Sequence, residues 1–480
     1  MSTCLVGSEM CIRDRQNKKA KKSVLDQKTL LNEVMKASSI TTENYFRVAK
    51  KGLKALAEDF LIYQQSKEYG SLFQRNMLLE SLQARGLTDY FEKEAKAIKE
   101  KADKSEPFYY YSLFAWELLT YNFDSFQTPK IFNSSPEKML EYINIHSDLE
   151  RLQCWLSLLN HINLSLFAPK DISTLSEEEL LKKKKNKQLV RRLKKYLRNL
   201  KKKATFQEPI IKVYHIALKF LLSWRMAKTE KAEKYFAKLR SYIFKEKSLS
   251  KRHLRPILLV ANNFCGIRIS RGEFEYAHYL WEQYKKMLDL ELFFEDKYIT
   301  PKEFKNIVTI GLMSGEIEET EKFIDEDIKK VPSKVRKYVE NFNRANLHFH
   351  KKEYEKTETL LQKMTRRTAK IDVSYVLGLR VLELKLYCEW ENHSDFDGEF
   401  QKRATAFESL LKKGAISIRN TKHFLTFIEN IGTVFEMKHY IMQKRKEKQE
   451  ILTNLLKKIR NPKSYVIERK WLIESIEGLL

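Results

Sequence analysis

Glycine and proline are scarce in this chain. There are 13 glycines and 9 prolines among 480 residues, less than half of the roughly 12% that the two types make up together on average. Folds rich in β-sheet need these residues at their many turns. The scarcity argues against such folds, and we expect an almost entirely helical chain.

Long apolar runs and paired cysteines are also missing. The best apolar run, residues 216–222, is interrupted by Lys219, and no run approaches the roughly 18 apolar residues of a membrane-spanning helix. The five cysteines are scattered, without a CxxC pair. Single thiols of this kind fit a reducing compartment. We therefore expect a soluble, cytoplasmic protein.

Motifs of common enzyme chemistry do not occur. The chain has no GxxxxGK[ST] or GxGxxG phosphate loop and no HExxH or GxSxG sequence. The only histidine and cysteine set considered for a metal is His348 and His350 with Cys388 and His393. Residues two apart on a helix point about 200° apart, so His348 and His350 cannot share a face as zinc ligands do. We expect no metal, no cofactor and no catalytic activity.

The chain is strongly basic, with a formal net charge of +27. One interpretation is attraction to a nucleic acid or to an acidic surface. The other is compositional, because abundant lysine goes with AT-rich codons and gives a solvated helix face. The overall composition favours the second interpretation.

One helical pattern recurs along the chain. Three segments begin with a turn residue and an acid: GEFEYAHYL at 272–280, GEIEETEKF at 315–323 and KEYEKTETL at 352–360. A weaker copy, AKTEKAEKY, occupies 227–235. Each copy has a small residue followed three positions later by a large apolar one. These pairs are Ala232 and Tyr235, Ala277 and Leu280, Thr320 and Phe323, and Thr357 and Leu360.

The small residue predicts a close approach of a second helix, with the large residues filling the contact on the same face. Another apolar-periodic helix precedes each of the last three copies. Two amphipathic helices joined by a tight turn cannot bury both apolar faces alone, so neighbouring hairpins should stack. The sequence therefore predicts an all-α chain, an α-solenoid of stacked antiparallel helical hairpins. The apolar residues of the preceding helices are Phe264, Cys265, Ile269, Phe304, Ile307, Val308, Leu312, Phe342, Ala345 and Phe349.

This pattern resembles a degenerate tetratricopeptide repeat over roughly residues 220–365. The turn at Gly315, the small Thr320 and the closing Pro332 lie at that family's offsets. The copies are spaced more widely than the 34 residues of the family. The resemblance implies hairpins whose front helices line a concave groove.

The first residues read differently from the rest of the chain. Residues 4–15, CLVGSEMCIRDR, resemble a transposase-type sequencing adapter translated in frame. We expect residues 1–15 to be an assembly artefact, which re-sequencing of the locus would test.

Residues 182–203 carry the densest charge, with 13 Lys or Arg in 22 residues and no acid. Leu189, Leu193, Leu197 and Leu200 make an apolar stripe at helical spacing. Three interpretations follow: a solvated helix packed by its leucine face, a nucleic-acid-binding helix, or a helix lying on an anionic membrane. Charge runs are usually solvated faces, which favours the first. The candidate residues for an anionic partner are Lys182, Lys183, Lys184, Lys185, Lys187, Arg191, Arg192, Lys194, Lys195, Arg198, Lys201, Lys202 and Lys203.

Aromatic side chains crowd residues 108–123. Such rings can stack on single-stranded bases, but in a helical chain the usual burial of aromatics favours a core. Residues 124–135 are expected to be a linker, and residues 293–300 a loop. The chain is divided into an artefactual or disordered start at 1–25, N-terminal hairpins at 26–123, a region ending in the basic helix at 136–206, repeats at 207–366, and C-terminal hairpins with a cap at 367–480.

The expected function is non-catalytic. We predict a scaffold or adaptor that binds a peptide or protein segment in the groove of the helical array. Its candidate residues are polar ones on the front helices, namely Asn262, Asn306, Asn341 and Arg344, because amides there can pair with a ligand's backbone. The alternative is nucleic-acid binding through residues 182–203 and neighbouring basic faces.

Overall fold

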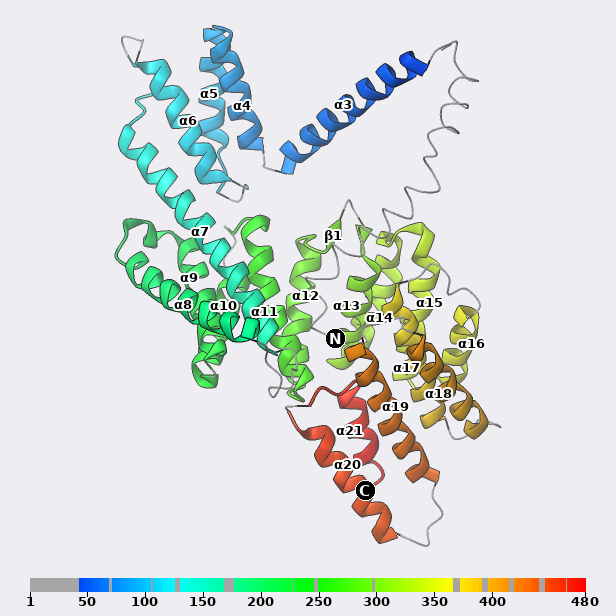
Figure 1. Cartoon of the computed structure of the whole chain (residues 1–480). Coiled ribbons are helices and arrows are strands. Elements are labelled where there is room, and N and C mark those ends of the chain that lie inside the picture. Colours follow the sequence, from blue (N-terminus) through cyan, green and yellow to red (C-terminus); the bar gives the residue numbers. More distant parts are fainter. Residues whose placement is uncertain are drawn as a thin grey trace. The chain divides into compact units, whose positions relative to one another are not determined.

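The protein is almost entirely α-helical in the computed structural model (Figure 1). Helices occupy 84% of the described residues, which confirms the all-α prediction. The structure describes residues 43–68, 71–104, 106, 108–125, 130–167, 177–226, 228–245, 249–295, 298–365, 372–390, 396–413, 418–439, 445–462 and 464–480. The adapter-like residues 4–15 lie outside this part of the chain.

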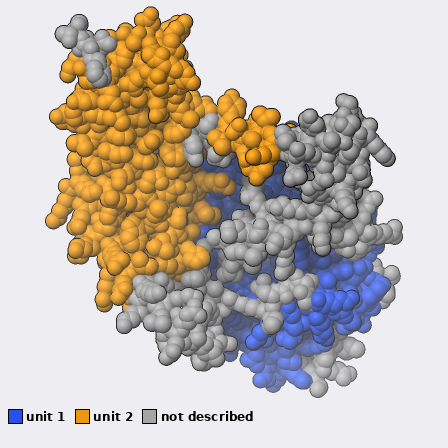
Figure 2. Space-filling view, turned by 45° about the horizontal axis from the view of Figure 1, so that its top comes forward, with its two compact units in different colours: residues 1–2, 166–171, 261–480 blue, residues 3–165, 172–260 orange. Residues whose placement is uncertain are grey.

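The chain divides into two compact units, which Figure 2 shows in separate colours. Unit 2 contains residues 3–165 and 172–260, and unit 1 contains residues 261–480 together with two short segments. The elements of the first 260 residues are α3 (Glu43–Glu68), α4 (Ser71–Ala84), α5 (Thr88–Lys101), α6 (Tyr109–Asp124), α7 (Pro136–Phe167), α8 (Glu177–Leu200), the 3-10 turn η2 (Ala204–Gln207), α9 (Pro209–Arg225), α10 (Thr229–Lys245) and the start of α11 (Lys251–Ser270).

Unit 1 continues with helices of 9 to 22 residues and one 3-10 turn. They are α12 (Tyr276–Asp289), α13 (Pro301–Met313), α14 (Ile317–Asp327), η3 (Ile328–Lys330), α15 (Ser333–His350), α16 (Tyr354–Thr365), α17 (Val373–Glu389), α18 (Phe396–Lys412), α19 (Ile418–His439), α20 (Arg445–Arg460) and α21 (Arg469–Glu477). Two short strands, β1 (Phe294–Glu295) and β2 (Tyr298–Ile299), lie between α12 and α13.

Helices in unit 1 pack against their neighbours in the chain and against alternate helices. α13 contacts α14, α15 contacts α16, and α17 contacts α18. α15 also contacts both α13 and α17, and α17 contacts α19. The apolar residues expected at these contacts, such as Phe304, Ile307, Phe342 and Ala345, are buried. Alternate helices from α13 to α19 therefore pack against one another as well as against their chain neighbours.

The small residue of each repeat copy is buried, as predicted. Ala232, Ala277, Thr320 and Thr357 are all at most 2% exposed. At Thr320 the approach of the two helices is very close, because a Cβ added at Gly311 of α13 would lie 2.1 Å from the Thr320 Oγ1 atom. The contact between α13 and α14 thus depends on a missing side chain in one helix and a short one in the other.

The large apolar residue follows a different register from the predicted one. The position three residues after the small residue is buried at Leu280 and Phe323 but only partly buried at Tyr235 and Leu360. The position four residues after it is buried in all four copies. The residues there are Phe236, Trp281, Ile324 and Leu361, none more than 4% exposed. The prediction was wrong for two copies because spacings of three and four both lie on one helix face.

The turn residue of each described copy adopts a left-handed backbone. Its φ angle is +97° at Gly272, +85° at Gly315 and +60° at Lys352. Glycine adopts this conformation without strain, whereas lysine does so at a cost. The predicted hairpin turns are confirmed at these three positions.

Two predicted connections are more ordered than expected. Residues 293–300 contain the antiparallel pair β1 and β2, with Phe294 opposite Ile299. After α6, the Asp124 carboxylate accepts hydrogen bonds from the backbone N–H groups of Ile131 and Phe132, at 3.0 and 3.1 Å. Phe132 then joins a buried core. The described part of the supposed linker is therefore packed into unit 2.

The aromatic residues of α6 contribute to that core. Trp116 and Phe123 are buried with Phe91 and Phe132, and the Phe91 and Phe123 rings are stacked with centroids 4.8 Å apart. The predicted core role is confirmed for these side chains. By contrast, the large apolar residues of α3 are exposed, including Leu53 and Phe60.

We predict that Gly311→Ala destabilises unit 1 by about 1–3 kcal/mol, because the new methyl group overlaps the Thr320 Oγ1 atom. Chemical denaturation followed by tryptophan fluorescence measures this, since the Trp281 ring also lies at Gly311. The double variant with Thr320→Ala should recover part of the loss. Gly432→Ala in α19, where a Cβ meets nothing within 4 Å, is the control. Equal stability of the Gly311→Ala and Gly432→Ala variants would contradict the close-packing account.

Candidate functional site

The basic helix α8 is attached to unit 2 by its apolar stripe. Leu193, Leu197 and Leu200 are 1%, 0% and 0% exposed. The N-terminal end of the stripe faces α7, because Leu189 and Leu193 line one small hollow together with Trp155 and Ile162. The predicted packing of the leucine face is confirmed.

A buried carboxylate fixes the C-terminal end of α8. Asp148 of α7 is 1% exposed and accepts hydrogen bonds from Lys203 Nζ at 2.8 Å, Thr205 Oγ1 at 2.9 Å and the Tyr196 hydroxyl at 3.3 Å. Burial and the Asp148 charge raise the pKa of Tyr196, so its hydroxyl stays protonated as a donor. Three donors from the end of α8 and the following turn thus converge on one acceptor.

The opposite face of α8 exposes its cations to solvent. Helix α8 ends at Leu200, so the last three lysines of the basic run lie in the turn beyond it. Lys203 is the only candidate in an ion pair among those whose side chains are described. The side chains of Lys182, Lys183, Lys184 and Lys185 lie outside the described residues. The exposed, unpaired candidates are Lys187, Arg191, Arg192, Lys194, Lys195, Arg198, Lys201 and Lys202.

Further cations lie beside this face on α9 and α10, and the sequence reasoning missed them. Lys219 of α9 is half-buried, and its pKa is lowered by burial and then by the charges of Lys201, Lys194 and Arg198. The charge of Lys238 on α10, together with those of Lys219 and Lys201, lowers the pKa of His215 on α9. The signal in the sequence was the lysine that interrupts the apolar run at 216–222. We use the term basic surface for the exposed lysines and arginines within residues 187–202 together with Lys219 and Lys238.

His215 lies beneath the basic surface. It is 7% exposed, and its ring packs edge-on against Phe206 at 5.2 Å. Burial, followed by the charges of Lys219, Lys201 and Lys238, lowers its pKa to about 4. The imidazole is therefore neutral near pH 7, and its buried Nε2 atom has no hydrogen-bond partner among the described residues.

The four residues predicted to line a groove have different surroundings. Asn262 of α11 donates from its amide to Met287 Sδ at 3.1 Å. Arg344 of α15 forms ion pairs with Glu340 at 3.0 Å and with Asp325 of α14 at 2.7 Å. Asn306 of α13 and Asn341 of α15 are half-buried, and their side-chain amides form no hydrogen bond within the described chain.

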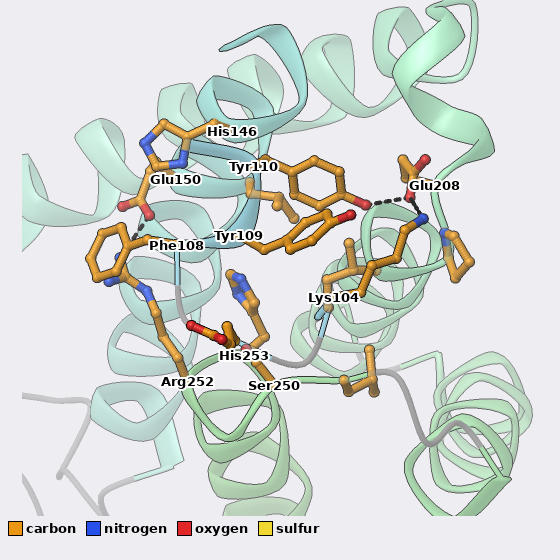
Figure 3. Close-up of a pocket in the computed structure, with 15 residues that line it drawn as sticks. Lys104, Phe108, Tyr109, Tyr110, His146, Glu150, Glu208, Ser250, Arg252 and His253 are labelled. Atoms are coloured by element: carbon orange, nitrogen blue, oxygen red, sulfur yellow. Dashed lines mark hydrogen bonds and ion pairs between the residues drawn. The ribbon is translucent and has the colours of Figure 1, made fainter. Parts of the chain in front are cut away.

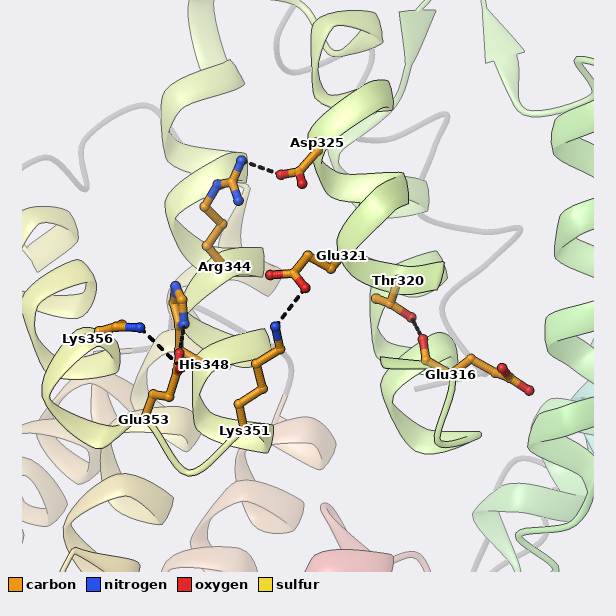
Figure 4. A network of polar contacts seen from close by, with 9 residues as sticks. All are labelled: Glu316, Thr320, Glu321, Asp325, Arg344, His348, Lys351, Glu353 and Lys356. Carbon is orange, nitrogen blue, oxygen red and sulfur yellow. Dashed lines mark hydrogen bonds and ion pairs between the residues drawn. The ribbon is translucent and has the colours of Figure 1, made fainter. Parts of the chain in front are cut away.

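Arg344 belongs to a network that joins neighbouring helices in unit 1 (Figure 4). Lys351, just after α15, pairs with Glu321 of α14 at 2.7 Å, parallel to the pairing of Arg344 with Asp325. The Glu353 carboxylate pairs with both His348 and Lys356. The His348 ring therefore already has a carboxylate partner. Across the described chain, no group of three or more His, Cys, Asp or Glu could hold a metal ion.

Unit 2 also contains a small cavity of about 90 Å³ (Figure 3). The guanidinium carbon of Arg252 lies 3.5 Å from the Phe108 ring centroid, and Arg252 pairs with Glu150 at 2.7 Å. Glu208 accepts from the Tyr110 hydroxyl and pairs with Lys104 at 3.6 Å. These four charged side chains are matched by opposite charges, and Glu106 accepts hydrogen bonds from Ser71 Oγ and the Leu72 N–H. The cavity therefore offers an ionic ligand less free charge than the basic surface does.

The chain was compared with protein families, curated proteins and solved structures. No protein-family model, curated protein or solved structure matches this chain. Among the described helices, none is both long enough and apolar enough to cross a membrane.

We predict that His215 makes the protein sensitive to mild acid. The unfolded chain binds a proton near pH 6.5, whereas the folded imidazole does so near pH 4. Protonation between these values therefore favours the unfolded state. From pH 7 to pH 4 the parent should lose about 2 kcal/mol more unfolding free energy than His215→Gln. Denaturation curves across this range measure the difference, with exposed His161→Gln as the control. Parallel losses in all three proteins would contradict the account.

Proposed function

We propose that the protein is a non-catalytic binding protein that holds a nucleic acid on the basic surface of unit 2. The observation that carries this proposal is the pairing pattern of the cations. Elsewhere in the described chain many exposed lysines and arginines have a carboxylate partner, such as Lys351 with Glu321. On the basic surface, neighbouring cations such as Arg191, Lys194 and Arg198 have none. A polyanion would supply the missing counter-charges.

The leucine face of α8 favours a nucleic acid over a membrane as the partner. A helix that lies on a membrane inserts a free apolar face between the lipids. In α8 this face is already used, because Leu193, Leu197 and Leu200 are buried inside unit 2. The exposed side chains on the described part of α8 are all polar, and most of them are charged. Charge without apolar insertion suits contacts with a phosphodiester backbone.

The fixed end of α8 supports the same proposal. The Asp148 carboxylate accepts hydrogen bonds from Tyr196, Lys203 and Thr205. These bonds fix the C-terminal end of α8, so the neighbouring cations project from a helix that is already ordered. Binding then costs less ordering of the protein than it would in an unattached basic tail. Phosphate contacts carry no base information, and we expect binding with little dependence on base sequence.

We predict that the charge-reversed variant Arg191→Glu, Arg192→Glu, Lys194→Glu and Lys195→Glu abolishes binding. All four side chains are exposed, so the fold should survive. Fluorescence anisotropy with labelled RNA and DNA oligonucleotides measures affinity at several salt concentrations, and the parent should show a steep decline with salt. A variant that reverses four exposed lysines of unit 1, Lys402, Lys446, Lys457 and Lys458, serves as the control. Absence of binding by the parent at low salt, or unchanged binding by the four-site variant, would reject the proposal.

A second candidate function rests on unit 1, which we propose is a solenoid of stacked hairpins related to tetratricopeptide repeats. The contacts of α15 with both α13 and α17 support a continuous row of front helices. Asn306 and Asn341 lie on two of those helices, and their side-chain amides form no hydrogen bond inside the described chain. Their free amides can pair with the backbone of an extended peptide.

For this candidate we predict that nuclease treatment leaves bound proteins in place. A pull-down from lysate compares the parent with Asn306→Ala/Asn341→Ala, and with exposed Asn454→Ala as the control. Proteins that survive nuclease and disappear only with the double variant would support a peptide groove. Loss of every partner after nuclease, or equal recovery by all three proteins, would count against it.

A further inference from the structure

Lys219 is unusual for its surroundings on α9. That helix is almost completely enclosed, with Leu218, Phe220 and Leu221 each 0% exposed. Lys219 lies between them as a half-buried side chain. A lysine in such a position loses hydration, and burial is the largest cause that lowers its pKa.

The neighbouring charges that lower the pKa of Lys219 further are all positive. They come from Lys201, Lys194 and Arg198. His215 lies one turn earlier on α9. After burial, the charges of Lys219, Lys201 and, from α10, Lys238 lower its pKa. None of these five cations takes part in an ion pair within the described chain. Helix α9 packs against α10 and against η2, which follows α8. Positive side chains from these neighbouring parts of unit 2 therefore lie around α9, and no carboxylate of the described residues pairs with them.

The buried lysines Lys385 and Lys305 of unit 1, unlike Lys219, have polar or charged partners. Lys385 is 6% exposed and pairs with Glu468 at 2.8 Å. Lys305, also 6% exposed, donates to the Ser374 carbonyl at 3.0 Å and lies 5.5 Å from the Tyr375 ring centroid. Each has a partner that offsets the cost of burial. Lys219 has no carboxylate partner of this kind among the described residues, and the charged groups that lower its pKa are Lys201, Lys194 and Arg198.

We propose that Lys219 is the central contact of a phosphodiester-backbone site, with Arg198 of α8, Lys201 of the turn after it and Lys238 of α10 as further phosphate contacts. This inference rests on the proposed function of the basic surface and assigns its centre to α9 rather than to α8. The cations come from α8, the turn after it, α9 and α10. Such a spread suits successive phosphates of one strand better than a single phosphate ion. A bound strand would also remove the repulsion among these side chains.

The test compares Lys219→Met with Lys212→Met. Both lysines are half-buried on α9, but Lys212 lies near Gln207, with 3.5 Å between Nζ and Oε1. Binding of a labelled single-stranded oligonucleotide is measured across a salt series. Losing one phosphate contact should reduce the slope of log K against log salt concentration by about 0.7. We expect this reduction for Lys219→Met and not for Lys212→Met.

Thermal unfolding without ligand gives a second readout. Removing the Lys219 charge relieves repulsion, so Lys219→Met should unfold at a higher temperature than the parent. Lys238→Met removes an exposed member of the cluster and should also reduce the salt slope, which keeps the test decisive if Lys219→Met fails to fold.

The outcomes separate this inference from the proposed function. Parent-like salt slopes for both Lys219→Met and Lys238→Met would overturn the α9 site while leaving nucleic-acid binding by α8 intact. No oligonucleotide binding by the parent at low salt would remove both. Binding to anionic lipid vesicles in place of the oligonucleotide would likewise overturn the site. Reduced slopes for both variants, with Lys212→Met unchanged, would support it.

Discussion

The fold depends on close contact between helices, because the described residues form only one small two-stranded sheet. Because apolar stripes are the main means of burial in a helical chain, each helix needs a neighbour close enough to exclude water. Gly311 and Thr320 show how the sequence permits this, since even one added carbon would overlap the facing oxygen. Where the contact residues are this small, dispersion and burial act over the full length of the helices.

The same constraint explains how much of the fold could be predicted from the sequence. Small residues such as Ala277 and Thr357, and turn residues such as Gly272, carry strong local signals and were located correctly. The large partner at Phe236 and Leu361 was missed, because adjacent apolar positions share one helix face and only the neighbouring helix decides which is buried. The order of residues 130–135 was also missed, since Asp124 fixes them through hydrogen bonds that no sequence period records.

The candidate site could be predicted only in part, for a similar reason. Local spacing was enough to place Leu193 and Leu197 under a charged face. The contribution of α9 was hidden, because Lys219 looks like a mere break in an apolar run until α8 and α10 are placed beside it. Among the groove residues, Arg344 had an acid on the preceding helix, and sequence distance does not show that pairing. Which charges meet across two helices depends on how the helices pack, and the local sequence does not show this.

The strand pair β1 and β2 accounts for part of the uneven spacing of the buried small residues. Thr320 follows Ala277 by 43 residues, whereas Thr357 follows Thr320 by 37. Part of the longer interval is taken up by the small β-hairpin between α12 and α13, while the buried small residue remains in place in both helices. Insertions and deletions can therefore accumulate in connections without disturbing the packed helices. A fixed spacing between small residues is therefore a poor guide to where packed helices recur in this chain.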